Sequence, residues 1–307
     1  MNNSNTDNTP ANFFKQYKPE LFLLLVAFYW GLSFPLIKTG LLYSSPIFFV
    51  FCRFLLCLII FLIFYRKKLP EIKSQDFSKG IILGILLYVG FVTQTIGLQY
   101  TTASNSAFIT GINLIFIPFI QIALIKKKPK PENIIGIIIV IVGLFHLSDM
   151  NKANINPGDF ITLICSVAFA FYIVLLSKYL ETINFLVLVL AQFSTMVVLT
   201  LTNSVIFEIF ILKTFVFETN FSLLFSLIFT GIFSTFFGVF LSIKYQKYVE
   251  PVRAGLIYNM EQVFAVIAAF FILKEILSLN QWIGAFLLFF GIFISEFFGK
   301  IKNIIKK

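Results

Sequence analysis

Ten apolar stretches fill most of this 307-residue chain. They span residues 21–38, 46–65, 78–98, 104–125, 133–148, 158–178, 184–204, 221–243, 253–273 and 280–298. Most are close to the ~20 residues that a helix needs to cross a ~30 Å hydrocarbon core. With 59% hydrophobic and 12% charged residues, the chain also differs from ordinary soluble domains. The sequence therefore predicts an all-α integral membrane protein with ten transmembrane helices.

Two regions leave the number of spans open. The fifth stretch is the shortest, and a second apolar run at 205–212 blurs the end of the seventh, so nine or eleven spans are alternatives. The segments between the stretches are mostly shorter than about a dozen residues. Such short connections exclude a separate soluble catalytic domain, so the protein's function is expected to lie within the membrane.

An internal repeat relates the two halves of the chain. Residues 98–145 align with residues 246–293 without a gap, at a constant offset of 148. The matches are Tyr100 with Tyr248, Ile109 with Ile257, Phe116 with Phe264, Lys126 with Lys274, Gly136 with Gly284, Gly143 with Gly291 and Phe145 with Phe293. Repeated glycines usually record close packing of helix backbones.

Matching spans are five apart, an odd number, so the second copy should cross the membrane in the opposite direction. We therefore predict two inverted five-helix repeats, at 21–148 and 158–298, which is an architecture of many secondary transporters. A cytoplasmic tail at 1–20 precedes them, and a basic cytoplasmic tail at 299–307 follows.

The distribution of basic residues predicts the orientation of the chain. In a ten-span topology, 19 of the 24 lysines and arginines fall on one side of the membrane. By the positive-inside rule, both termini of this multi-pass protein are expected to be cytoplasmic. We expect the bilayer to be the cytoplasmic (inner) membrane. The same bias accounts for the net charge of +10, which points to lipid headgroups as partners and not to nucleic acid.

No pattern in the sequence indicates a cofactor or a metal site. Cys52, Cys57 and Cys165 lie within apolar stretches without metal-ligand spacing, and His146 is the single histidine. No GxxxxGK[ST] motif for ATP is present. The first apolar run has no small-residue cleavage site after it and is interpreted as a span.

Two charged residues lie deep within predicted spans. A charge there costs about 2.5 to 3.5 kcal/mol on insertion scales, so each needs a reason. Glu261 lies eight residues into the ninth span, about 12 Å from its cytoplasmic end at 1.5 Å per residue. Arg53 enters the second span from the other side, so the two charges could lie within about 6 Å of the same level.

Several roles are open for this pair. The two residues could form an ion pair, or each could serve structure alone, with Arg53 bonding helix carbonyls. Glu261 could also bind a cationic or amine group, or carry a proton. We expect Glu261 to face other helices, because Ala254, Tyr258, Ala265 and Ala268 share its helix face.

Other polar residues are candidates for lining a cavity. The repeat places Asn113 opposite Glu261 and Thr110 opposite Tyr258, within a polar stripe on the fourth span. Gln94 in the third span and Trp30 in the first are further candidates. Trp30 lies in the middle of its span, whereas tryptophan is enriched at the membrane interface. Interhelical hydrogen bonds would explain the stripe equally well.

Several short motifs occur along the chain in a specific order: Trp30-Gly31-Leu32-Ser33-Phe34, Arg53-Phe54, the run from Gly97 to Phe108, Pro251-Val252-Arg253-Ala254, the run from Tyr258 to Ala265, and Lys274-Glu275. Their order and spacing resemble those of EamA-type permeases in the drug/metabolite transporter superfamily. The resemblance covers nearly the whole chain. Gln262 and Lys274 depart from it, since the family often has proline and glycine there. The missing proline puts a kink in the ninth span in doubt.

The resemblance implies ten helices, a central cavity between the repeats, alternating access and, usually, export. Family members handle amino acids, nucleosides, cofactors and sugars, so the substrate stays open. We therefore predict a secondary transporter, not an enzyme, that moves a small organic metabolite outward by proton coupling or exchange. Spans 1, 3, 4, 6, 8 and 9 would surround the path. Trp30, Gln94, Asn113, Tyr258 and Glu261 would bind substrate.

Two alternative functions remain open: a non-transporting scaffold or sensor, and an intramembrane enzyme acting on lipid-linked substrates. The enzyme would need clustered carboxylates, a base or metal ligands at membrane depth, and the sequence offers only isolated charges. The scaffold predicts no solute flux. A homodimer is also left open.

Overall fold

The computed structural model describes residues 10–147, 156–274, 276 and 278–305, and every regular element in them is helical. The first half contains α1 (Pro10–Gly40), α2 (Pro46–Tyr65), η1 (Arg66–Lys68), α3 (Ser74–Tyr100), α4 (Ala103–Gly111), α5 (Asn113–Ile125) and α6 (Pro131–Leu147). The second half contains α7 (Pro157–Leu180), α8 (Phe185–Asn203), η2 (Ser204–Ile211), α9 (Phe221–Phe229), η3 (Thr230–Phe237), α10 (Gly238–Gln246), α11 (Pro251–Tyr258), α12 (Met260–Leu273) and α13 (Leu279–Ile305).

In the described part of the chain, eight helical segments are long and apolar enough to cross a membrane. They are Tyr17–Gly40, Pro46–Lys68, Ser74–Tyr100, Ala103–Ile125, Pro157–Leu180, Phe185–Ile211, Phe221–Gln246 and Pro251–Leu273. The fifth and tenth predicted spans correspond to the shorter apolar helices Pro131–Leu147 and Leu279–Ser295. At 1.5 Å per residue, the 17 residues of α6 fall slightly short of a ~30 Å core, whereas α13 continues past Ser295 to Ile305. The count of ten stays a prediction.

Three boundaries differ from those expected. The apolar run at 205–212 is not a further span: η2, a π-helix, continues α8 through Ile211. Helix α1 begins at Pro10, well before the first apolar stretch, so much of the predicted N-terminal tail is helical. Helix α13 likewise runs through most of the predicted basic C-terminal tail. Residues 1–9, 148–155 and 306–307, which complete the predicted tails and the end of the first repeat, lie outside the described residues.

Local sequence explains where most helices begin. Proline opens α2, α6, α7 and α11, where its missing N–H costs no intrahelical bond. Asn156 caps α7 in a capping box with Asp159, and Asn184 and Asn220 accept backbone N–H groups at the starts of α8 and α9. These signals set the residue at which each of these helices begins.

The repeat reappears in the backbone at Lys126 and Lys274. These residues, which the sequence alignment matches, end α5 and α12. Both adopt the left-handed conformation, with φ of 59° in each case and ψ of 25° and 28°. A left-handed residue after the last turn is a common way to end a helix. The matching spans of the two halves therefore end with the same geometry.

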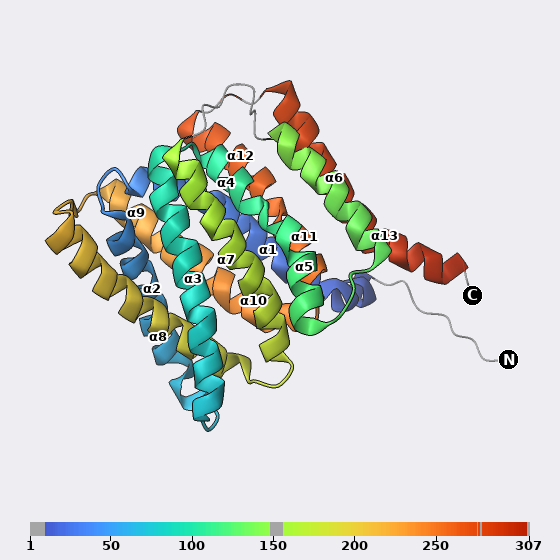
Figure 1. Cartoon of the computed structure of the whole chain (residues 1–307), viewed down its shortest axis with the longest axis horizontal. Coiled ribbons are helices and arrows are strands. Elements are labelled where there is room, and N and C mark those ends of the chain that lie inside the picture. Colours follow the sequence, from blue (N-terminus) through green and yellow to red (C-terminus); the bar gives the residue numbers. More distant parts are fainter. Residues whose placement is uncertain (1–9, 148–155, 275, 277, 306–307) are drawn as a thin grey trace.

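Helices α6 and α13 form a closely packed pair at one side of the bundle (Figure 1). Their repeat-matched glycines meet crosswise. A Cβ atom built on Gly136 would lie 2.7 Å from the carbonyl oxygen of Gly291, and one built on Gly143 would lie 2.9 Å from that of Gly284. Reciprocal contact of this kind is expected when two copies pack about a pseudo-two-fold axis. The glycines allow the backbones to approach this closely.

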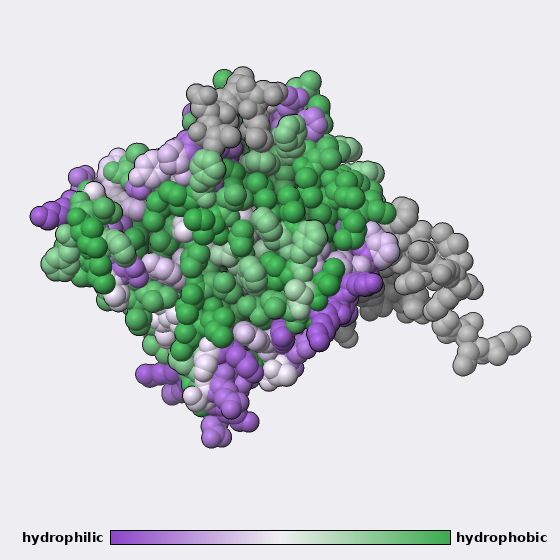
Figure 2. Space-filling view, viewed as in Figure 1, coloured by the Kyte–Doolittle hydropathy of each residue, from purple (hydrophilic) through white to green (hydrophobic). Residues whose placement is uncertain are grey.

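The surface of the bundle matches a membrane environment. Figure 2 shows a broad hydrophobic face across the middle of the molecule, with hydrophilic residues gathered along its lower edge. Large apolar side chains such as Phe145, Phe160 and Phe233 are exposed on it or on neighbouring faces. An apolar surface of this extent belongs against lipid tails, so the chain is a multi-pass membrane protein.

Candidate functional site: a cavity between the two halves

A cavity lies at the centre of the bundle, between helices from both halves of the chain. Its lining residues are Trp30, Ser33, Leu87, Phe91, Gln94, Thr110, Asn113, Phe169, Tyr172, Ile173, Ser234, Val239, Tyr258, Asn259, Glu261 and Gln262. They come from the six spans expected around the path: spans 1, 3, 4, 6, 8 and 9. Space not filled by atoms amounts to about 630 Å³, but the centre of a water molecule can reach only about 40 Å³ of it. The cavity is therefore narrow in this conformation.

Two interrupted helices form one wall of the cavity. The fourth span breaks at Ile112, between α4 and α5, and the ninth breaks at Asn259, between α11 and α12. At the second break, Asn259 Nδ2 donates to the carbonyl oxygen of Gly255 at 2.9 Å, beside the helical bond that the backbone N–H of Asn259 donates to the same oxygen at 3.0 Å. The ninth span is thus interrupted without the proline that the resemblance called for.

The two breaks face each other across the centre of the molecule. Asn259 Nδ2 also donates to Asn113 Oδ1 at 3.3 Å, which joins the start of α5 to the break before α12. At the other break, the hydroxyl of Ser166 in α7 donates to the carbonyl oxygen of Ile109. Irregular backbone at membrane depth needs such partners, and it is found where a helix lines a cavity.

Glu261 is the acidic residue of this wall. It is the second residue of α12, its side chain is 7% exposed, and it lines the cavity. Among the described residues, no hydrogen bond or ion pair engages its carboxylate. A buried carboxylate without protein partners is costly, so it is available for a proton or for a ligand.

Trp30 and Tyr258 form an aromatic corner of the cavity. Their ring centroids lie 5.1 Å apart at an interplanar angle of 46°. Trp30 Nε1 donates to the carbonyl oxygen of Ser234 at 2.9 Å, and the Tyr258 hydroxyl donates to Gln246 Oε1 at 3.1 Å. Gly238 adjoins the indole so closely that a Cβ atom there would lie 2.6 Å from Trp30 Nε1. Both rings are held in place by hydrogen bonds to neighbouring helices, Trp30 by a bond to η3 and Tyr258 by a bond to α10.

Gln94 and Thr110 join α3 to α4 at the cavity. Gln94 Nε2 donates to Thr110 Oγ1 at 3.1 Å, and Thr110 in turn donates to the carbonyl oxygen of Ser106 at 2.9 Å. The five residues proposed to bind substrate, namely Trp30, Gln94, Asn113, Tyr258 and Glu261, thus line one cavity.

Arg53, in contrast, is buried outside the cavity lining. Its Nε donates to Thr235 Oγ1 at 3.0 Å and its Nη2 to Ser234 Oγ at 3.4 Å. The guanidinium carbon lies 5.4 Å from the ring centroid of Phe91. The structure does not bring Arg53 and Glu261 together: the ion pairs of the described residues involve other side chains. In this conformation Arg53 joins α2 to the π-helical segment η3.

Sequence reasoning missed several residues of this region. Tyr172, Asn259 and Gln262 also line the cavity. The sequence did contain a signal for Tyr172, because its phenol lies in the middle of an apolar span, as the indole of Trp30 does. Glu208 is a second buried carboxylate, and it accepts the backbone N–H groups of Ile47 and Phe48 at 2.8 and 3.1 Å. Since these groups open α2, Glu208 caps that helix.

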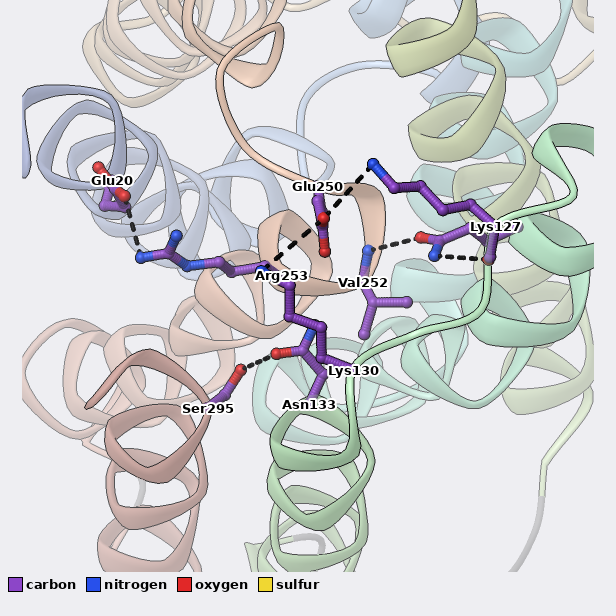
Figure 3. Close-up of polar contacts among 9 residues, drawn as sticks. Glu20, Lys127, Lys130, Asn133, Glu250, Val252, Arg253 and Ser295 are labelled. Carbon is purple, nitrogen blue, oxygen red and sulfur yellow. Dashed lines mark hydrogen bonds and ion pairs between the residues drawn. The ribbon is translucent and has the colours of Figure 1, made fainter. Parts of the chain in front are cut away.

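Charged residues meet at the end of the bundle that the lysine distribution assigns to the cytoplasm (Figure 3). Glu250 Oε1 lies 3.5 Å from Lys127 Nζ and 3.9 Å from Lys130 Nζ, while Arg253 Nη2 lies 3.0 Å from Glu20 Oε1. These ion pairs connect the loop between α5 and α6, and helix α1, with the start of α11. Ionic contacts therefore link the two halves on this side.

No cluster that could hold a metal ion is present in the described ranges, where no three His, Cys, Asp or Glu side chains come together suitably. His146 lies at the end of α6 with its ring 6.2 Å from that of Phe145. The chemistry of the cavity is therefore that of hydrogen bonds, aromatic faces and one carboxylate.

Comparisons with known proteins agree with this architecture. The chain is 33% identical to an uncharacterized transporter of Archaeoglobus fulgidus over 91% of its own length and 86% of that protein. It is 25% identical to the uncharacterized transporter YyaM of Bacillus subtilis over 52% of this chain and 57% of the relative. A crystal structure with 14% identity shares the fold, with a TM-score of 0.75 over 92% of this chain and 99% of the other.

A family model provides the most direct assignment. The model of the EamA-like transporter family matches twice, at residues 18–148 and at residues 156–297, and so covers nearly the whole chain. This protein belongs to the EamA-like transporter family.

Proposed function

We propose that this membrane transporter moves a small organic metabolite out of the cell through the central cavity, by alternating access with proton coupling or exchange. The observation that carries the proposal is the placement of Glu261. It is a buried carboxylate without a described partner, in a cavity lined by both halves of the chain. A group held this way can exchange a proton for a substrate, or bind each in turn.

The packing of the two halves supports an inverted repeat. The crosswise glycine contacts between α6 and α13, the matching left-handed ends at Lys126 and Lys274, and the two breaks near Ile112 and Asn259 all relate one half to the other. In inverted repeats, rocking of one half against the other exchanges the side on which a central site opens. We propose this motion for the present protein, with both termini in the cytoplasm and ten spans.

The narrow cavity indicates how such a cycle would proceed. An organic solute needs more room than the ~40 Å³ open to water centres, so helices must separate before it can bind. The ion pairs of Glu250 and Arg253 hold the proposed cytoplasmic end together in this conformation. We propose that these contacts break when the site opens toward the cytoplasm.

Transport, its direction and its coupling are tested together in reconstituted vesicles. Metabolites that accumulate outside cells with the protein, and not outside cells without it, supply the candidate substrates. Uptake of each is then measured in proteoliposomes under an imposed pH gradient, under substrate exchange and with no gradient. Proton coupling predicts flux that follows the pH gradient, and exchange predicts flux only with substrate on both sides. Absence of flux under every gradient would contradict the proposal and favour a scaffold or sensor.

A further inference from the structure

The side chains that line the cavity indicate a class of substrate. This inference rests on the proposed function. Glu261 is the only acidic or basic side chain among the described lining residues. The other buried charge nearby, Arg53, lies behind Phe91 and is held by the hydroxyls of Thr235 and Ser234. The cavity therefore offers a bound solute a carboxyl group, which an ammonium ion would stabilise in its negative form, and no cation.

The hydrogen-bond donors of the cavity are largely occupied by protein acceptors. The indole N–H of Trp30 and the hydroxyls of Tyr258 and Tyr172 donate to Ser234, Gln246 and Gln192, respectively. The hydroxyls of Thr110 and Ser33 donate to backbone carbonyl oxygens. Both hydrogens of the Asn259 amide are used, one by Asn113 and one by Gly255. The side-chain donors without a described protein acceptor include the amide nitrogens of Asn113 and Gln262, so an anion or a carbonyl-rich solute would find these amides in the same cavity as the carboxyl group of Glu261.

Several acceptors of the cavity also lack a protein partner. The carboxylate of Glu261 has no hydrogen-bond partner among the described residues, and Asn259 Oδ1 and Gln262 Oε1 are buried without one. The orientation of the Asn259 amide is fixed, because its nitrogen faces the carbonyl oxygen of Gly255, which can only accept. Unpaired buried acceptors are expensive, and a ligand that brings N–H donors would remove that cost.

The remaining lining suits a cation with an apolar body. Trp30 and Tyr258 meet at 46° and present two neighbouring aromatic rings, whose faces attract a cation. Leu87 on α3 and the α7 residues Phe169 and Ile173 add apolar surface to the lining. One carboxylate, aromatic walls and spare acceptors together are complementary to an ammonium group on a hydrophobic framework.

We propose that the cavity binds an organic ammonium ion with N–H donors, that is, a protonated primary or secondary amine with an apolar or aromatic body. The negative charge of Glu261 selects the cation. The spare acceptors favour N–H groups over a quaternary ammonium, and the aromatic corner favours the hydrophobic part.

Fluorescence of Trp30 provides a direct test. The chain has two tryptophans, and the other, Trp282, is 57% exposed on α13. A Trp282→Phe protein therefore carries its only indole in the cavity. This protein, purified in detergent, is titrated at pH 7 with phenethylamine, its trimethylated quaternary analogue, 2-phenylethanol, phenylacetate and phenylalanine. The five probes share one ring and differ in charge and in N–H donors.

The proposal predicts that phenethylamine changes the Trp30 fluorescence saturably. It also predicts that the quaternary analogue binds at least about tenfold more weakly, and the other probes more weakly still. Glu261→Gln in the same background should weaken phenethylamine binding by about tenfold or more, whereas Glu71→Gln, at an exposed position outside the membrane, should not change it. Equal or tighter binding of the alcohol, the acid or the zwitterion, or no response to phenethylamine, would overturn it.

The experiments distinguish an error in the proposed substrate class from an error in the proposed transport function. Saturable binding of phenethylamine without its flux in vesicles under any gradient would support the binding inference and contradict the transport proposal. Flux of a neutral or anionic solute, with no binding of the amine, would leave transport in place and overturn the ammonium class.

Discussion

The backbone of Gly284 packs directly against that of Gly143. A Cβ atom built on Gly284 would lie 2.6 Å from the carbonyl oxygen of Gly143, and the same holds within a few tenths of an ångström for Gly291 and Gly136. Because Gly136 matches Gly284 and Gly143 matches Gly291 in the repeat, each glycine contacts the counterpart of the other. This close contact between the two halves thus follows their sequence symmetry.

Substituting Gly284 by leucine tests this contact. The side chain would meet backbone atoms of Gly143 and Leu147, which cannot move aside as a flexible side chain can. We expect the free energy of unfolding to fall by roughly 1–3 kcal/mol, the usual cost of overpacking. Thermal unfolding in detergent, followed by size-exclusion chromatography, measures the change. Ile283→Leu, at an exposed neighbouring position, is the matched control. Equal melting temperatures for both variants would contradict the close contact.

Substituting Arg53 by lysine tests the structural role of the guanidinium group. Lysine retains the charge but loses the planar group that bonds Thr235 and Ser234, so we expect roughly 1–3 kcal/mol lower stability. Thr235→Val removes one of the same bonds, and the double variant should lose less than the sum of the two single variants. Fully additive losses would mean that Arg53 and Thr235 do not act as a pair. A stable Arg53→Lys protein would contradict the structural role.

Reversing the charge of Glu250 tests the ionic contacts at the proposed cytoplasmic end. Glu250→Lys would repel Lys127 and Lys130, and exposed pairs of this kind contribute up to about 1 kcal/mol. A shift of that size raises the ratio of cytoplasm-open to closed states about fivefold, so labelling from the cytoplasmic side should become faster by about the same factor. The readout is the rate at which a thiol reagent added from the cytoplasmic side labels Ser33→Cys, with the three native cysteines replaced by alanine.

Two variants accompany the labelling experiment. Glu71→Lys adds the same charge change at an exposed loop and should leave the rate unchanged. Exchanging Lys127 and Lys130 for glutamate in the Glu250→Lys protein should restore the slow rate, because opposite charges again meet. An unchanged labelling rate in Glu250→Lys would mean that these ion pairs do not hold the cytoplasmic side closed.

Much of the fold follows from hydropathy and the repeat. The apolar stretches locate the helices, and the alignment of Lys126 with Lys274 corresponds to two helix ends with the same conformation. The interruption at Asn259 was not predictable from proline, because no proline stands there; instead, the side-chain amide of Asn259 bonds the carbonyl oxygen of Gly255 at this point. Helix η2 was also missed, since an apolar run after a span does not reveal a π-helical continuation.

The candidate site was predictable in part. Glu261 and Trp30 stand out because a charge and a tryptophan in mid-span each carry an energetic cost or an unusual position. Tyr172 and Gln262 gave weaker signals, since a phenol or an amide in a helix can equally face a neighbouring helix. Only the packing of α7 and α12 around the cavity shows that Tyr172 and Gln262 line it. Likewise, the separation of Arg53 from Glu261 depends on how α2 meets η3 and not on their depth in the membrane.

The most direct test of the central claim is substrate flux through Glu261→Gln protein in reconstituted vesicles, at matched protein level. Glutamine keeps the size of the side chain and removes its charge and its proton. If Glu261 lies in the solute path, flux should be abolished or lose its dependence on the pH gradient, while Glu71→Gln transports normally. Flux and pH dependence equal to those of the wild type would contradict the account.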